Sequence, residues 1–208
     1  MSILTKHFWF DDRMIKDGTW ASLSNGAKGV YVSIAVHCDE EGTAFPGEDT
    51  IAKLTGLSRK TVRKAINELA KAGLLRIERW KTKRGHSAKR YHVKKTPRDT
   101  GFPFSKDIVA TGTWGEMGSC GQAVYISMRN YCYWDGYEES YDSLTDFKER
   151  TFEYCSAEIE YLLEDTGVTK STYYRGIKSL LDVGMIQRGI DENGKKAYMV
   201  GLLPDQFY

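Results

Sequence analysis

The stretch that decides the fold runs from Leu54 to Leu75 and consists of LTGLSRKTVRKAINELAKAGLL. Gly56 suits the left-handed backbone of a turn between two helices, and Ser58 is a favourable N-cap for the helix that follows. Apolar residues then recur at three- and four-residue steps until Gly73, as in a helix with one buried face. The stretch therefore predicts the turn and the second helix of a helix-turn-helix.

A weaker copy of this stretch lies near the C-terminus, from Leu163 to Ile186. Four positions recur 111 residues later (167 − 56 = 111): Gly56, Thr61, Leu69 and Gly73 correspond to Gly167, Thr172, Leu180 and Gly184. Upstream, Gly18-Thr19-Trp20 and Val30-Tyr31-Val32-Ser33 correspond to Gly112-Thr113-Trp114 and Val124-Tyr125-Ile126-Ser127, at an offset of 94 (112 − 18 = 94). Two ordered matches in each half predict a duplicated domain. The offsets differ by 17 (111 − 94 = 17), which places an excess of 17 residues between Ser127 and Leu163.

The first copy has the pattern of three helices followed by a hairpin. Apolar residues at helical spacing predict helices over Asn25–Val36, with Ser24 as N-cap, and over Thr50–Thr55. After the helix that begins at Ser58, Leu74–Trp80 and Lys89–Val93 predict two strands around a loop at residues 81–88. This order is that of a winged helix, and we expect it to occupy residues 1–96.

The second copy predicts the same order in residues 104–208, after a linker at residues 97–103 that contains two prolines and a glycine. Its helices are expected over Gly118–Cys132, Ala157–Thr166 and Thr169–Val183, and its hairpin tip at Asp191–Lys195. The predicted fold class is therefore α+β, mainly α, with two tandem winged-helix domains. An insert at about residues 130–155 mixes aromatic and acidic residues, and it either packs on the core of its own domain or forms a protein contact surface.

Charge separates the two halves, although the net charge of the whole chain is only +2. Residues 1–98 hold 20 Lys/Arg and 10 Asp/Glu (20 − 10 = +10), whereas residues 99–208 hold 10 and 18 (10 − 18 = −8). Halves of similar fold and opposite charge are expected to differ in their partners.

The sequence carries no signature of secretion, membrane insertion or metal binding. It has no apolar leader and no run of 18 apolar residues, so we expect a soluble intracellular protein. Its four cysteines form no C-x-x-C pair, and its four histidines have no metal-ligand spacing with them. It also lacks a G-x-x-x-x-G-K-[ST] phosphate loop, and no cofactor, metal or small-molecule effector is expected.

The exposed face of the predicted recognition helix carries the candidate DNA contacts. Such a helix lies in the major groove, where its N-terminal residues reach base edges and flanking cations neutralise phosphates. Arg59, Lys60 and Arg63 are the best candidates for base contacts, and Ser58 and Thr61 suit phosphate oxygens. Further candidates are Lys64 and Asn67 on the helix, and Lys81, Lys83, Arg84, Lys89 and Arg90 in the hairpin. A solvated cationic helix face would not explain why basic residues recur in the hairpin.

The matching face of the second copy supplies a second set of candidates: Thr169, Lys170, Ser171, Thr172, Tyr174, Arg175 and Lys178. Acidic residues surround this face, at Glu164, Asp165 and Asp182. The second domain is therefore expected to bind either DNA or protein.

The stretch from Phe45 to Leu75 resembles the helix-turn-helix of bacterial winged-helix replication initiators of plasmids, phages and integrative elements. Its Ser58-Arg59-Lys60-Thr61-Val62-Arg63 segment is also similar to the GntR family of transcription regulators. The second resemblance implies that Arg59, Thr61 and Arg63 contact operator DNA. The helical effector-binding half of that family is missing, so the tandem arrangement looks more like the initiators. In those proteins one copy binds origin repeats and the other dimerises or also binds DNA.

The leading hypothesis is a sequence-specific double-stranded DNA-binding protein that initiates replication of a plasmid, phage or integrative element. The alternatives are a transcription regulator with tandem winged helices and a protein–protein adaptor that acts through the acidic second domain. Further candidate partners are a second copy of this chain and replication or transcription proteins, with no membrane partner. No His-hydrophobe-His metal site accompanies the tyrosines, so we do not expect an enzyme. Such a protein would work in the cytoplasm, on the nucleoid or a plasmid.

Overall fold

The computed structural model describes residues 7–81, 87–94, 100–133, 151–191 and 193–204. The first half contains β1 (His7–Asp11), α1 (Arg13–Lys16), α2 (Thr19–Ser22), α3 (Asn25–Ala35), β2 (Thr43–Ala44), α4 (Glu48–Thr55), α5 (Arg59–Lys71), β3 (Leu75–Lys81) and β4 (Ser87–Val93). The second half contains β5 (Gly101–Ser105), α6 (Asp107–Ala110), α7 (Thr113–Glu116), α8 (Gly118–Asn130), β6 (Cys132–Tyr133), β7 (Phe152–Cys155), α9 (Ile159–Thr166), α10 (Lys170–Asp182), β8 (Ile186–Ile190) and β9 (Lys196–Gly201). This mixture of helix and strand agrees with the predicted α+β class.

The helix-turn-helix of the first half forms where the sequence predicts it. Ser24 caps α3 by accepting a hydrogen bond from the Ala27 amide, and Ser58 caps α5 in the same way through the Thr61 amide. Gly56 has φ of 69°, the left-handed turn conformation that glycine adopts at least cost. The apolar side chains of α5 are buried, namely Val62, Ala65, Ile66 and Leu69.

Some predicted boundaries need correction. Helix α4 begins at Glu48, two residues before the predicted start, because acids at a helix N-terminus are favoured by the helix dipole. The strands of the first hairpin extend to Lys81 and begin at Ser87, so the ladder is longer than predicted. In the second half α8 ends at Asn130, and α9 begins at Ile159. Thr169 is the N-cap of α10 rather than its first residue.

The second half repeats the element order of the first and adds one strand, β6. Its sheet has the order β6-β7-β9-β8, whereas the first half has β2-β4-β3. Strands β6 and β7 flank the predicted aromatic insert, whose residues 134–150 lie outside the described part of the chain, as does Glu192 in the predicted hairpin tip.

The halves meet in a strand pair that the sequence did not predict. Antiparallel β1 and β5 pair Phe8 with Phe104 and Phe10 with Phe102, around Trp9 opposite Pro103. The offset of 94 converts the first pair into the second (8 + 94 = 102; 10 + 94 = 104), so the pairing has the symmetry of a two-fold axis. The predicted linker at residues 97–103 is therefore too long, because residues 101–103 already belong to β5.

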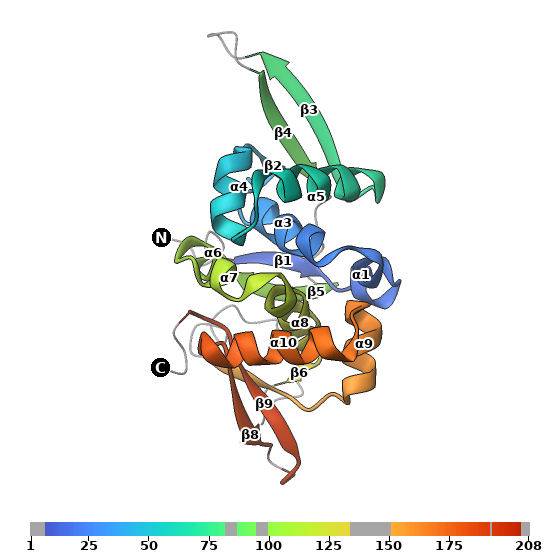
Figure 1. The fold of residues 1–208 in the computed structure, drawn as a ribbon, viewed down its shortest axis with the longest axis vertical. Helices are drawn as coiled ribbons and strands as arrows, with labels where there is room; N and C mark the ends of the chain where they lie inside the picture. The colour runs from blue at the N-terminus through green and yellow to red at the C-terminus, as the bar shows by residue number, and fades with distance from the viewer. Residues whose placement is uncertain (1–6, 82–86, 95–99, 134–150, 192, 205–208) are drawn as a thin grey trace.

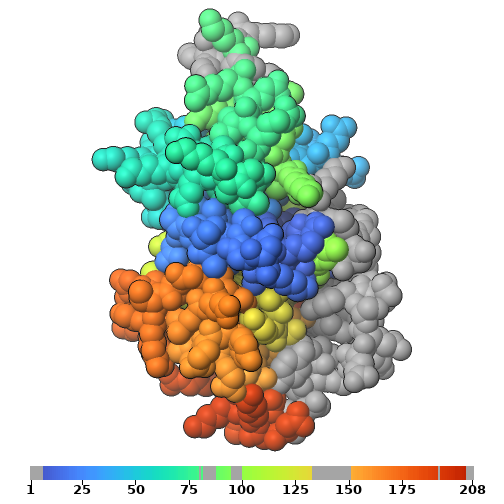
Figure 2. Space-filling model, turned by 90° about the vertical axis from the view of Figure 1, so that its right-hand side faces the viewer, coloured from blue at the N-terminus to red at the C-terminus, as the bar shows by residue number. Residues whose placement is uncertain are grey.

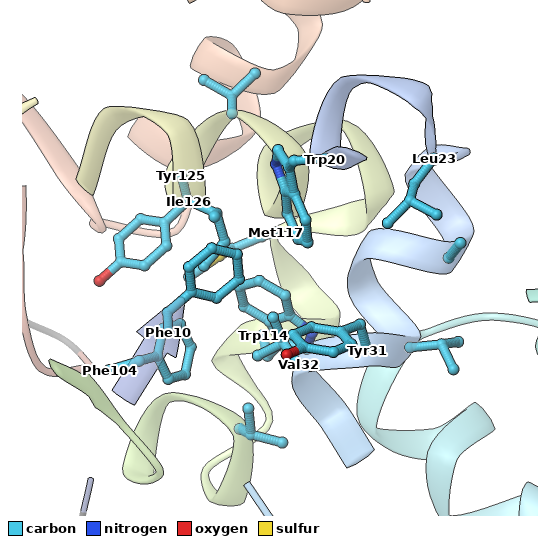
Figure 3. Close-up of a cluster of buried hydrophobic side chains, with 14 of the residues drawn as sticks. Phe10, Trp20, Leu23, Tyr31, Val32, Phe104, Trp114, Met117, Tyr125 and Ile126 are labelled. Carbon is cyan, nitrogen blue, oxygen red and sulfur yellow. The ribbon is translucent and has the colours of Figure 1, made fainter. Parts of the chain in front are cut away.

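Each half buries an equivalent aromatic triad beside this strand pair (Figure 3). In the first half the ring centroids of Phe10 and Trp20 lie 5.0 Å apart, and those of Phe10 and Tyr31 lie 6.1 Å apart. In the second half Phe104 lies 5.4 Å from Trp114 and 6.1 Å from Tyr125. Each member of the second triad stands 94 residues after its counterpart (104 − 10 = 94), which is the offset of the predicted upstream match.

Two buried polar side chains cross between the halves in the same symmetric manner. Lys28 on α3 donates from Nζ to the carbonyl of Thr166, the last residue of α9, over 2.8 Å. Gln122 on α8 donates from Nε2 to the carbonyl of Thr55, the last residue of α4, over 3.3 Å. These donors are 94 residues apart (122 − 28 = 94) and the acceptors 111 (166 − 55 = 111). The absence of a side chain at Gly29 allows α3 and α8 to approach closely, since a Cβ there would lie 2.1 Å from Gln122 Oε1.

The two halves therefore share one continuous hydrophobic cluster. Figure 1 shows β1 and β5 at the centre of an elongated molecule, with hairpins β3–β4 and β8–β9 projecting from opposite ends. No helix within the described residues is long and apolar enough to cross a membrane.

Candidate nucleic-acid interface

The exposed face of α5 presents most of the predicted helix contacts to solvent. Its exposed residues are Ser58, Arg59, Lys60, Arg63, Lys64 and Asn67, whereas Thr61 is half-buried. The hydroxyls of Ser58 and Thr61 lie 2.9 Å apart and share a hydrogen bond. Ser58 Oγ also accepts from the Thr61 amide over 3.2 Å, so these two hydroxyls order the start of the helix.

The first hairpin adds cations beside the same helix. Lys81 ends β3 and is exposed, while Lys89 and Arg90 are half-buried on β4. The guanidinium of Arg90 lies 5.0 Å from the ring centroid of Phe45, a cation–π distance. Two of the predicted hairpin contacts, Lys83 and Arg84, lie outside the described residues.

Two acids at the start of α4, which were not among the predicted site residues, pair with cations of α5 and β4. Glu48 Oε2 lies 2.6 Å from Arg63 Nε, and Glu48 Oε1 lies 2.6 Å from Lys89 Nζ. Asp49 Oδ1 lies 2.8 Å from Arg59 Nε. The acids follow Gly47 in the first turn of α4, which is a sequence signal for helix initiation. Their partners come from α5 and β4, however, and only the fold brings these elements together.

The Glu48 carboxyl stays ionised between its two cations. Burial acts to raise its pKa, but hydrogen bonds from Lys89 and Arg63, together with their charges, outweigh this and hold the pKa below its ordinary value. The carboxylate lines a groove of about 560 Å³ between α4, α5 and β4. The phenol oxygen of Tyr91, buried in the wall of this groove, makes no hydrogen bond to a described residue.

The second half presents a comparable but less cationic face on α10. Lys170, Ser171, Tyr174, Arg175 and Lys178 are exposed, while Thr169 caps the helix through the Thr172 amide over 3.3 Å. Arg175 Nη2 donates to Thr172 Oγ1 over 3.1 Å. The offset of 111 places Tyr174, which is 53% exposed, where the first half has Arg63 (63 + 111 = 174).

Helices α5 and α10 lie on the same side of the molecule. Both stand in front of their own halves in Figure 1, and Figure 2, turned by 90°, shows the teal and orange surfaces of these segments along one edge. This arrangement follows from the two-fold relation between the halves, with the axis close to the viewing direction of Figure 1.

Comparison with known proteins supports the prediction of a helix-turn-helix in the first half, which contains α5. Residues 21–75, from α2 to the first residue of β3, match the model of a helix-turn-helix domain family. Comparison with curated proteins gave no match. The chain thus contains a helix-turn-helix domain, which indicates that its partner is DNA.

Proposed function

We propose that the protein binds double-stranded DNA in a sequence-specific manner, with α5 in the major groove and the β3–β4 hairpin along the adjacent backbone. The observation that carries the proposal is the exposed N-terminal face of α5, with Arg59, Lys60 and Arg63 next to the cations of the hairpin. A major groove admits one helix, and arginine recognises guanine by donating to O6 and N7 together.

The ion pairs of the free protein are compatible with base contact. Arg63 and Arg59 each use Nε for the carboxylate. The terminal Nη atoms of these arginines make no hydrogen bond to a residue that the structure describes. Those atoms are the ones available for a bidentate contact with guanine.

We further propose that the second half is a second winged helix and that α10 contacts the same duplex. Helix α5 packs on α3, α3 on α8 and α8 on α10. At about 8–10 Å for each packed pair, the axes of α5 and α10 would lie about 24–30 Å apart if the row were straight. Major grooves on one side of a duplex recur about every 34 Å. The similar spacing and the shared side of the molecule support two contacts by one chain.

Within this class we propose a replication initiator of a mobile element. The proposed tandem arrangement supports this role, because the replication initiators that the helix-turn-helix resembles also have two copies in tandem. A transcription regulator is the alternative, and it would bind one promoter instead of repeated origin sites. A third candidate is an adaptor whose acidic second half binds protein. We propose DNA binding without catalysis, and a nicking assay on supercoiled DNA with added divalent metal tests for catalysis.

The test is selection of genomic fragments by the purified full-length protein at a stated salt concentration, because the affinity of DNA-binding proteins depends strongly on salt. Repeated sites in an intergenic region support an initiator, and one site at a promoter supports a regulator. Salt-sensitive binding without enrichment, or no binding, contradicts sequence-specific recognition. The full chain is required because β1 pairs with β5, so removal of the second half would expose the edge of β1.

The contribution of α10 is tested on the selected site. Tyr174→Ala with Arg175→Ala alters only exposed side chains and should narrow the protected region to one half-site. Tyr161→Ala, at an exposed position on α9, is the control because it removes an exposed tyrosine outside α10 and the hairpin. Full protection by the Tyr174→Ala, Arg175→Ala variant would restrict DNA contact to the first half.

A further inference from the structure

Glu48 joins three elements of the candidate interface through one carboxylate. It stands in the first turn of α4, and its two oxygens bind Arg63 on α5 and Lys89 on β4. Each distance is 2.6 Å, typical of a strong charge-assisted hydrogen bond. The carboxylate therefore fixes the recognition helix and the hairpin relative to each other.

The environment of Glu48 differs from that of the neighbouring acid. The side chain of Glu48 is only 15% exposed, whereas that of Asp49, which pairs with Arg59, is 74% exposed. An exposed ion pair is screened by water and holds its partners loosely. The Glu48 pairs are better shielded, so they restrict Arg63 more than Asp49 restricts Arg59.

The second half provides an internal comparison. At the offset of 111, the second half has Ile159 where the first has Glu48 (48 + 111 = 159), and Tyr174 where the first has Arg63 (63 + 111 = 174). Asp49 and Arg59 are replaced by Glu160 and Lys170, which keep their charges. Lys89 pairs with Arg79 in the first hairpin, and Lys196 pairs with the corresponding Ile190 in the second (79 + 111 = 190), so Lys196 takes the place of Lys89. Lys196 is exposed. The acid and the arginine are therefore present together in one half and absent together from the other.

We propose that Glu48 is a positioning residue for DNA specificity: it holds the Arg63 guanidinium by Nε, with both Nη atoms directed at the bases. This inference rests on the proposed function. An arginine free to adopt many rotamers loses conformational entropy when it binds guanine, and it can also turn toward a phosphate. A fixed arginine makes the base contact at lower cost and tolerates other bases less well.

The experiment compares Glu48→Gln with Asp49→Asn as the matched control. Both variants remove one negative charge near DNA, so both should bind nonspecific duplex more tightly than the wild type. Random-sequence duplexes first select the wild-type site. Each variant is then titrated with that site and with versions changed at one base pair at a time. Thermal unfolding of each variant checks the fold.

Glu48→Gln should lose about fivefold or more of the discrimination at the base pair that Arg63 contacts. Asp49→Asn should keep the wild-type ratio of affinities for the selected site and for the site changed at that base pair. In an Arg63→Ala background, Glu48→Gln should have no further effect on that ratio. A third variant, Glu48→Asp, keeps the charge but is too short to bridge both cations, and should lose discrimination without tighter nonspecific binding.

The outcomes separate this inference from the proposed function. If the wild type selects no sequence from the random pool, the proposed function fails. If it selects a site, and Glu48→Gln keeps the wild-type discrimination as Asp49→Asn does, then Glu48 contributes only charge and the inference is overturned. Loss of discrimination in Glu48→Gln that persists in the Arg63→Ala background would also overturn it.

Discussion

At the scale of single residues, Lys28 places an ammonium group at the junction of the two halves. Its side chain is 1% exposed, and Nζ donates to the carbonyls of Leu23 and Thr166 over 2.6 and 2.8 Å. Burial lowers the pKa of Lys28 from 10.5 to about 8, while the charge of Glu68 acts in the opposite direction. The charged form is thus disfavoured by folding, although its hydrogen bonds hold α3 against the end of α9.

The lowered pKa predicts a pH dependence of stability. Between pH 8 and pH 10.5 the unfolded chain keeps the Lys28 proton that the folded chain has lost, so rising pH favours the folded state. Relative to Lys28→Gln, the free energy of unfolding of the wild type should rise by up to about 3 kcal/mol across this range. Gln122 already fills the equivalent position of the other half, so glutamine is a compatible replacement. Denaturant titrations that show a constant difference would contradict the prediction.

At the scale of elements, local signals in the sequence predicted the helix-turn-helix and both hairpins. Helix caps, turn glycines and apolar periodicity act within a few residues, and Ser58 and Gly56 supply them here. Strands β1 and β5 carry no such signal, because each is five residues long and pairs with a strand from the other half, far away in the sequence. The ion pairs of Glu48 were missed for a similar reason, since Arg63 and Lys89 become its neighbours only in the folded chain.

The N-cap of α5 gives a prediction for the stability of the helix that we propose to bind DNA. Ser58→Ala removes the side-chain acceptor for the Thr61 amide and should lower the free energy of unfolding by about 1 kcal/mol. Ser171→Ala is the control, because Ser171 is exposed in the first turn of α10 and Thr169 makes the cap there. Thermal or denaturant unfolding measures both variants. Equal effects would show that the Ser58 cap does not stabilise α5.

At the scale of the whole molecule, the shared core predicts that both halves unfold together. Phe10 is fully buried and packs 5.2 Å from Phe102 of the other half, measured between ring centroids. Phe10→Ala should therefore lower the free energy of unfolding by about 3–5 kcal/mol. Hydrogen exchange should show faster exchange in both α5 and α10. Faster exchange confined to the first half would mean that the halves are independent units.

The central claim is that α5 binds DNA through its N-terminal arginines. The most direct test is the affinity of Arg59→Ala with Arg63→Ala for the selected site, measured over a series of salt concentrations. The control is Lys16→Ala with Lys71→Ala, which removes two exposed charges away from the N-terminal turns of α5, one on α1 and one at the C-terminal end of α5. We predict that the arginine variant loses about 1–3 kcal/mol of binding free energy for each base contact, together with its preference for the site. The control should lose only salt-dependent affinity, by the same factor for every DNA sequence. Equal losses in the two variants, with site preference intact, would contradict the account.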